Sequence, residues 1–182
     1  MGPARMPLPI LTERLALRPY DPDDVAQIHT VLYGDPAAMR LLGGPLDVHG
    51  ARAAVERYIA QLRREGYSFA PVIERETGLI AGEAGLYPFA GGGPDVELGY
   101  ALGPAFWGRG YATEAGRALL AEAFGPLGVD RVVAVTREEN TGSRHVLAKL
   151  GFIPAGRRHA WGFEQLYFVR ERRRDDAPAA TI

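Results

Sequence analysis

Residues 96–115, VELGYALGPAFWGRGYATEA, contain the stretch of sequence that decides the fold. From 96 to 102 apolar residues alternate with Glu, Gly and Ala, and this period of two predicts a strand. A loop containing Gly108 and Gly110 follows, and a helix is expected to begin at Thr113. Glycines let a backbone approach a ligand closely, and the N–H groups at the start of a helix suit a phosphate. The stretch therefore predicts a strand, loop and helix with an anion near the helix start.

Two well-known phosphate loops do not fit this stretch. A Walker A loop needs Gly-Lys followed by Ser or Thr, but Tyr111 follows Gly110. A Rossmann fingerprint needs a glycine at the position of Thr113. The alternative is that both glycines serve only the turn between strand and helix, as glycines often do there.

The segments on either side predict one α/β domain. Upstream, periodicity predicts a strand over 12–20 and then a helix that begins within 21–24 and is closed by Gly34 and Pro36. A second helix is predicted over 47–64, with Gly66 as its C-cap. A hairpin of strands over 67–74 and 79–87 follows. A glycine-rich loop, 90–94, precedes the deciding stretch. Downstream we expect a helix over 113–124, a strand over 131–136, a helix over 141–150 and strands over 152–157 and 163–172. Without repeats or linkers, these elements predict a single domain over 11–172 with flexible termini at 1–10 and 173–182.

Composition excludes several classes of protein. The chain has 182 residues, 47% of them apolar, with 21 basic against 22 acidic residues and a net charge of −1. A near-neutral balance argues against a nucleic-acid binder, and no apolar run reaches the roughly 20 residues of a membrane span. Residues 1–10 contain three prolines and no secretory pattern. Zero cysteines exclude disulfides and a cysteine nucleophile and suit the cytoplasm. The four histidines lack metal-ligand spacing, so no metal is expected.

The glycine loop resembles that of a known family. Residues 107–112, WGRGYA, resemble the Gln/Arg-x-x-Gly-x-Gly/Ala signature of the GNAT N-acetyltransferases, whose loop binds the pyrophosphate of acetyl-CoA. Trp107 departs from the first position of that signature. Residues 140–152 resemble the family's Asn-x-x-Ser helix, which ends in Leu-Gly-Phe, and residues 11–19 look like the start of the ribosomal-protein N-acetyltransferase-like branch. The resemblance covers residues 11–171.

This resemblance implies a fold and a cofactor site. It implies a GNAT fold with a mixed, mostly antiparallel sheet of about seven strands and flanking helices. Strand 96–102 would be the fourth strand, splayed from the fifth so that the pantetheine arm enters between them, with Gly99 at a bulge. The residues implied to contact acetyl-CoA are Tyr100, Ala101, Leu102, Trp107, Gly108, Arg109, Gly110, Tyr111, Ala112, Thr113, Asn140 and Ser143.

The resemblance also implies direct transfer of acetyl from the thioester to an amine, which needs no cysteine. An alkylamine is protonated at neutral pH, so a general base is needed. Glu97, on the strand that lines the thioester, is the first candidate, and Glu83 in the sequence GEAG is the second. For each, the alternative is an exposed carboxylate on a strand.

Two residues are candidates for the acid that protonates the leaving thiolate. Ser143 matches a position that the ribosomal-protein branch places near the sulfur, and its alternative role is in the first turn of a helix. Tyr167 lies in the last strand, where packing in the sheet is the alternative. Because CoA thiolate is a fair leaving group, a strong acid is not required.

The acceptor is expected to be a small-molecule or peptide amine. Tyr87, Phe89, Trp161 and Phe163 are candidates for the pocket wall. The loops at 34–47 and 88–94 carry no acidic run of the kind that a polycation favours, so a peptide N-terminus or an amino-acid-like amine is predicted. A different class, an acyl-CoA sensor of the same fold without turnover, stays open. So does a homodimer.

Overall fold

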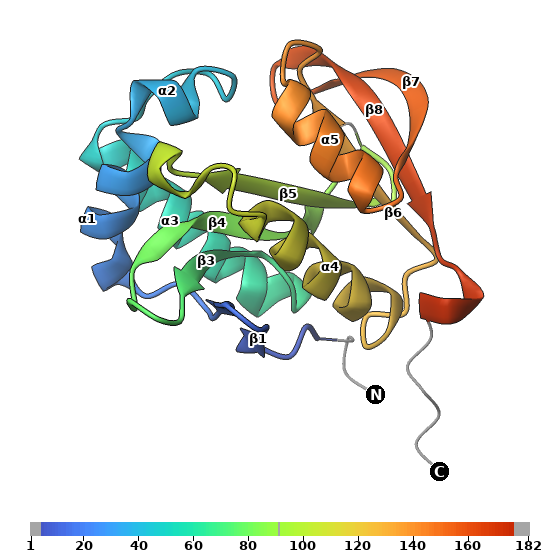
Figure 1. Ribbon diagram of the computed structural model, residues 1–182, viewed down its shortest axis with the longest axis horizontal. Coiled ribbons are helices and arrows are strands. Elements are labelled where there is room, and N and C mark those ends of the chain that lie inside the picture. Colours follow the sequence, from blue (N-terminus) through green and yellow to red (C-terminus); the bar gives the residue numbers. More distant parts are fainter. Residues whose placement is uncertain (1–4, 91, 177–182) are drawn as a thin grey trace.

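The computed structural model describes residues 5–90 and 92–176 and contains one eight-stranded sheet in the order β1-β2-β3-β4-β5-β6-β8-β7 (Figure 1). Its strands are β1 Ile10–Leu11, β2 Leu15–Leu17, β3 Phe69–Glu74, β4 Ile80–Pro88, β5 Val96–Leu102, β6 Arg131–Thr136, β7 Ile153–Ala160 and β8 Phe163–Glu171. Among the strands of the described residues, only β5 and β6 pair in parallel. The predicted mixed, mostly antiparallel sheet is confirmed. The sheet has eight strands instead of about seven, because β1 folds back on β2.

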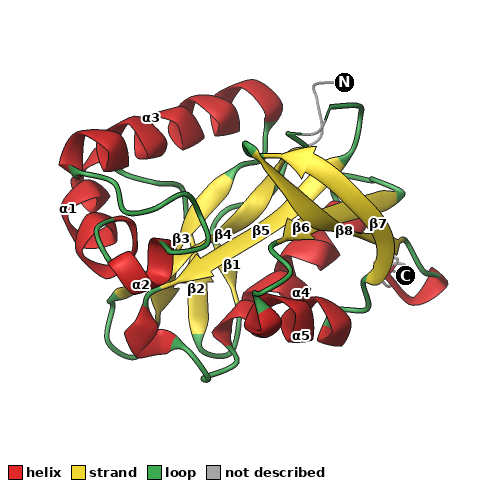
Figure 2. Cartoon of the chain, turned by 90° about the horizontal axis from the view of Figure 1, so that it is seen from above, coloured by secondary structure: helices red, strands yellow, loops and turns green. Residues whose placement is uncertain are grey.

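Helices cover both faces of this sheet (Figure 2). On one face lie α1 and α3, and on the other lie α4 and α5. The helices are α1 Val25–Ile28, which continues as a π-helix over His29–Tyr33, α2 Pro36–Met39, α3 Val48–Glu65, α4 Tyr111–Phe124 and α5 Thr141–Lys149. Short 3-10 helices occur at Pro22–Asp24, Pro104–Phe106 and Arg174–Asp176. Helix α4 begins two residues earlier than predicted, because Gly110 takes a left-handed conformation and starts it.

Two apolar clusters stabilise the layers. The larger one fills the space between the sheet and α4 and α5, with Leu98, Leu119, Phe124 and Leu147 fully or almost fully buried. The second lies between the sheet and the first three helices and contains Ile28, Leu32, Val55 and Tyr58. Because apolar area removed from water drives folding, these two clusters hold the sheet rigid between its helices.

Glycines in the middle of the sheet make room for an aromatic ring. Gly85 pairs with Gly99 in a regular register. A Cβ atom at Gly99 would lie 2.4 Å from the Phe69 ring, and one at Gly85 would lie 2.3 Å from the Phe69 backbone. The bulge that we expected at Gly99 is therefore wrong, since the β4–β5 pairing shows no register shift there. Close packing of Phe69 is what requires these two glycines.

The strands β5 and β6 separate after a short pairing. Their parallel ladder consists of Val96 with Val132 and Glu97 with Val133. Beyond Glu97, β5 still pairs with β4 as far as Leu102 but no longer with β6. The expected splay between the fourth and fifth long strands is present, and it opens the sheet at the end that faces α5.

The ends of the described chain are packed more firmly than the sequence suggests. Met6 and Ile10 are both buried in the larger cluster, within the segment that we expected to be a flexible terminus. At the other end, Asp176 accepts hydrogen bonds from the guanidinium of Arg170 at 2.8 and 3.0 Å. Residues 1–4, Gly91 and residues 177–182, which also belong to predicted flexible segments or a predicted loop, lie outside the described residues. Within the described ranges, no helix is both long and apolar enough to cross a membrane.

Candidate active site

The glycine loop forms an anion cradle at the start of α4. Gly108 and Gly110 have φ angles of +74° and +80°, which only glycine adopts readily. Within the described part of the chain, no backbone N–H from Gly108 to Thr113 donates a hydrogen bond to a protein acceptor. Six successive backbone donors without a protein acceptor, at the positive end of a 14-residue helix, suit an anion.

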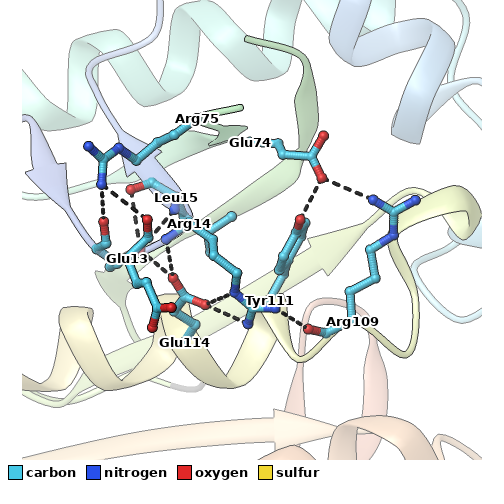
Figure 3. Close-up of polar contacts among 9 residues, drawn as sticks. Glu13, Arg14, Leu15, Glu74, Arg75, Arg109, Tyr111 and Glu114 are labelled. Carbon is cyan, nitrogen blue, oxygen red and sulfur yellow. Dashed lines mark hydrogen bonds and ion pairs between the residues drawn. The ribbon is translucent and has the colours of Figure 1, made fainter. Parts of the chain in front are cut away.

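A buried carboxylate holds the loop side of the cradle (Figure 3). Glu74, at the end of β3, accepts a hydrogen bond of 2.9 Å from Arg109 and one of 2.5 Å from the Tyr111 hydroxyl. These donors, Tyr111 first, hold the pKa of Glu74 below its ordinary value. The Arg109 side chain therefore points back at Glu74, and the loop presents its backbone outward.

A second carboxylate holds the helix side of the cradle (Figure 3). Glu114, in the first turn of α4, accepts hydrogen bonds of 2.6 Å from the Thr12 hydroxyl and 2.7 Å from Arg14. Another nitrogen of the same Arg14 guanidinium donates a hydrogen bond to the Arg109 carbonyl at 2.9 Å. Burial opposes the charge of Glu114, but the bonds from Thr12 and Arg14 still keep its pKa low. Thr12 and Arg14, near the start of the chain, thus connect the glycine loop to the first turn of α4.

Trp107 lies at the edge of the cradle and is about half exposed. Its indole N–H donates to the Leu102 carbonyl at 2.8 Å, so it ties the loop to the end of β5. Thr113 is buried, whereas Gly108, Arg109 and Gly110 are exposed. The side chain at the first position of the signature therefore holds the loop against β5, a structural role that tryptophan can fill.

A cavity of about 280 Å³ occupies the splay between β5 and β6. Its lining includes Tyr100 and Ala101 of β5, Ser143 and Leu147 of α5, and Asn140, the N-cap residue of α5. The Tyr100 hydroxyl lies 3.1 Å from the Ser143 Oγ, and burial raises the pKa of Tyr100 to about 12. The Asn140 side chain accepts the Ser143 N–H and caps α5. Four of the twelve predicted cofactor residues line this cavity, whereas Leu102 and the seven residues 107–113 of the glycine loop do not.

Glu97 lies on the cavity wall where the two strands part. Its side chain is only 6% exposed, and both carboxylate oxygens accept the indole N–H of Trp161 at 3.0 Å. Burial raises the pKa of Glu97 to about 7, although the bond from Trp161 opposes this shift. A carboxylate that titrates near neutrality can take up a proton there.

Trp161 reaches Glu97 from a strained turn. It has a φ of +56°, and Gly162 beside it has a φ of +82°, so both central residues of the β7–β8 turn are left-handed. Two-residue hairpins of this type normally use Asn-Gly, and a bulky residue at positive φ costs free energy. The Trp161 ring also packs against Tyr87, with 5.7 Å between ring centroids. This strained conformation places the indole directly on the base candidate.

Glu83 lies on the same face of the sheet but in a closed polar cluster. It accepts hydrogen bonds from the hydroxyls of Tyr20 at 2.8 Å and Tyr33 at 2.5 Å. Burial raises the pKa of Glu83 despite these donors. Since the register pairs Glu83 with Ala101, it is four residues of strand from Glu97, or about 13 Å. The two candidates for the base therefore occupy different parts of the cavity wall.

Most of the chain matches the model of a known protein family. The family model described as acetyltransferase (GNAT) domain matches residues 14–153. This chain belongs to the GNAT acetyltransferase family. The strand, cradle and splayed cavity are the parts of the GNAT domain that the sequence predicted.

Relatives and solved structures agree with the family assignment. The chain is 32% identical over 150 residues to a protein of Bacillus licheniformis named uncharacterized N-acetyltransferase p20, covering 81% of this chain and 83% of that one. The acetyltransferase from Agrobacterium tumefaciens superposes with a TM-score of 0.77 at 27% identity, covering 90% and 94%. RimL, a ribosomal L7/L12 α-N-protein acetyltransferase solved with coenzyme A, shares the fold with a TM-score of 0.75 at 19% identity, covering 91% and 97%.

Two predicted residues of this GNAT acetyltransferase lie away from the cavity. Tyr167 projects from β8, where its hydroxyl lies 3.4 Å from an oxygen of Asp95. Its ring packs on Phe89, which also fails to line the cavity. Trp161 and Phe163 do line it, while Tyr87 stands behind Trp161. The structure therefore brings Glu97, Glu83 and Ser143 to one cavity and leaves Tyr167 outside it.

Sequence reasoning missed several residues of this site. Tyr33 and Tyr58 line the cavity beside Glu83, and two arginines, Arg57 and Arg137, also face it. They come from α3, from the π-helix and from the loop after β6, and no local spacing connects these segments. Among the described residues there is no cluster of His, Asp or Glu that could hold a metal.

Proposed function

We propose that this chain is an acetyl-CoA-dependent N-acetyltransferase that acts on the primary amine of a peptide N-terminus or of an amino-acid-like molecule. One observation carries the proposal. A buried glutamate, Glu97, with a pKa of about 7 lines a cavity that opens between two splayed strands beside an anion cradle. Family membership supplies the class of reaction, and Glu97 supplies the base that the class requires.

The residues present fit acetyl-CoA. The free N–H groups from Gly108 to Thr113 suit a pyrophosphate, which accepts hydrogen bonds through its oxygens. The amides of a pantetheine arm match backbone groups of β5 that lack a partner on β6, and the Asn140 side chain lies on the same cavity. When bound, the cofactor supplies an acetyl thioester as the electrophile.

The reaction balances with Glu97 as the base. The lone pair of a neutral amine attacks the thioester carbonyl carbon, so that an N–C bond forms and the C–S bond breaks. The Glu97 carboxylate takes the proton that the amine nitrogen loses, and the sulfur leaves with a proton from solvent or a hydroxyl. We assign that hydroxyl to Ser143, whose Oγ is hydrogen-bonded to Tyr100. The products are an amide and the CoA thiol.

A thiol-release assay with acetyl-CoA tests this function. The acceptors are peptides, amino acids, polyamines and aminoglycosides, and calorimetry with acetyl-CoA is run in parallel. We expect turnover with peptides or amino acids. A clear preference for a polycation would contradict the acceptor class. Binding of acetyl-CoA without turnover of any amine would contradict the enzyme and favour a sensor.

A further inference from the structure

Four charged side chains line the cavity, two acidic and two basic. They are Glu83, Glu97, Arg57 and Arg137. Glu83 already has donors within the protein. Burial raises its pKa, and the hydroxyls of Tyr33 and Tyr20 and then the nearby charge of Arg57 oppose that shift. Glu83 is therefore the carboxyl of this cavity with less need of a ligand donor.

The other two charged groups are not compensated by the protein. Among the described residues, the side-chain oxygens of Glu97 meet uncharged donors, the indole N–H of Trp161 and the backbone N–H of Ala90, and no cation pairs with them. Arg137 forms no ion pair with any residue that the structure describes, and its Nε is buried without an acceptor. A buried donor that lacks a partner costs free energy, and a ligand that supplies an acceptor recovers it.

Arg137 is held in place by an aromatic ring. Its guanidinium carbon lies 3.8 Å from the centroid of Phe163, which also lines the cavity. Stacking of this kind fixes a guanidinium plane while its N–H groups stay available for a carboxylate. Phe163 lies two residues beyond Trp161, so the same hairpin end supports both Arg137 and Glu97.

The two uncompensated charges are set apart along the splay. Glu97 pairs with Val133 on the neighbouring strand, and Arg137 follows Val133 by four residues, or about 13 Å of strand. That is a separation of backbone positions. Because both side chains line the same cavity, a small ligand that contacts both of them carries a positive and a negative group. An α-amino acid has this arrangement.

Much of the remaining wall is apolar. Met39, Leu41, Leu42, Leu46 and Phe69 line the same cavity. A volume of about 280 Å³ is at the small end for ligand sites, and the pantetheine arm must share it. The small size and the apolar part of the lining favour a small acceptor with an apolar side chain.

We propose that the acceptor is an α-amino acid with an apolar side chain, with its amine at Glu97 and its carboxylate bound by Arg137. This inference rests on the proposed function and narrows its acceptor. A peptide N-terminus would present a neutral carbonyl to Arg137, which would leave the guanidinium uncompensated. During transfer the amine nitrogen forms the new amide bond, and the carboxylate is unchanged.

Matched pairs of acceptors isolate the carboxylate. Thiol release is measured with phenylalanine and leucine, with their primary amides, and with a dipeptide that begins with phenylalanine. We expect kcat/KM to be about tenfold or more higher for each amino acid than for its amide, mainly through KM, as for loss of a charge-assisted hydrogen bond. An amide or dipeptide used as well as the amino acid would overturn the inference while leaving the acetyltransferase intact.

Substitutions assign the preference to one arginine. Arg137→Met and Arg137→Gln should both bring the ratio of amino acid to amide toward one. Arg52→Met, on an exposed residue of α3 that does not line the cavity, is the matched control and should keep the wild-type ratio. A ratio unchanged in both Arg137 variants would overturn the inference. No turnover with any amine would instead remove the proposed function.

Discussion

Two pairs of glutamates occupy the two ends of the site, and their surroundings are opposite. At the cradle, Glu74 and Glu114 accept hydrogen bonds from arginines and hydroxyls, and the pKa of each is lowered. At the other end, burial raises the pKa of Glu83 and Glu97, whose donors among the described residues are uncharged groups such as tyrosine hydroxyls and the Trp161 indole. The comparison shows that arginines and hydroxyls hold the carboxylates of the cradle in their charged form, whereas burial raises the pKa of the carboxyls at the other end, where we propose that the amine binds.

The largest expected effect breaks the amine end. Glu97→Gln should lower kcat by about 10² or more, because the amide cannot take up the amine proton. The dissociation constant for acetyl-CoA should stay close to that of the wild type, since the cradle lies outside the change. Glu83→Gln is the companion variant, and we expect a smaller loss. A silent Glu97→Gln with a large loss in Glu83→Gln would move the base to Glu83.

A second effect, somewhat smaller, breaks the cradle. Gly110→Asp introduces a negative charge where the pyrophosphate is expected, and should raise the dissociation constant for acetyl-CoA about tenfold or more. Gly110 also has a φ of +80°, so strain alone must be controlled. Gly128→Asp provides that control, because Gly128 has a φ of +66° with open space around it, in the loop after α4. Unchanged affinity in Gly110→Asp by calorimetry would refute the cradle.

The smallest expected effect compares one tryptophan at each end. kcat/KM should fall as the pH drops through about 7, because a protonated Glu97 cannot accept a proton. Trp161→Phe removes the N–H that favours the carboxylate, so the pKa of Glu97 should rise. The acidic limb of the pH profile of kcat/KM should then move to higher pH by up to about one pH unit.

Trp107→Phe is the control for this shift. It also removes an indole N–H, but one that donates to a backbone carbonyl at the cradle. The acidic limb of its kcat/KM profile should stay near pH 7. If the midpoint of the pH profile shifts equally in both variants, or does not shift in Trp161→Phe, then Trp161 does not set the pKa of the base.

Most of the fold could be predicted because its signals are local. The alternation over 96–102 gave β5 with both ends correct, and the cap at Gly66 marked the end of α3. The two-residue strand β1 was missed because two residues show no period. The bulge at Gly99 was wrong because the reason for that glycine is the Phe69 ring, 30 residues away in the sequence.

The site was predictable only where it follows the chain. The cradle and Glu97 come from one stretch of 20 residues, so the motif that defines the loop also led to the base candidate. The Trp161 indole is 64 residues from Glu97, and the Tyr33 hydroxyl is 50 residues from Glu83. Such pairs depend on the packing of the sheet, which side-chain types and spacing do not reveal. The same is true of Arg137 and its place in the cavity.

The short ladder between β5 and β6 has a consequence for the mechanics of the domain. Two pairs of residues join a half-sheet of five strands to a half-sheet of three, so the backbone seam between the halves is nearly open. The pantetheine arm that we propose to enter this seam would add hydrogen bonds that the two strands do not share. Its binding would join the two halves, so the protein should become more stable as the concentration of that ligand rises. The acyl donor would then be a removable structural part of the sheet as well as a reactant.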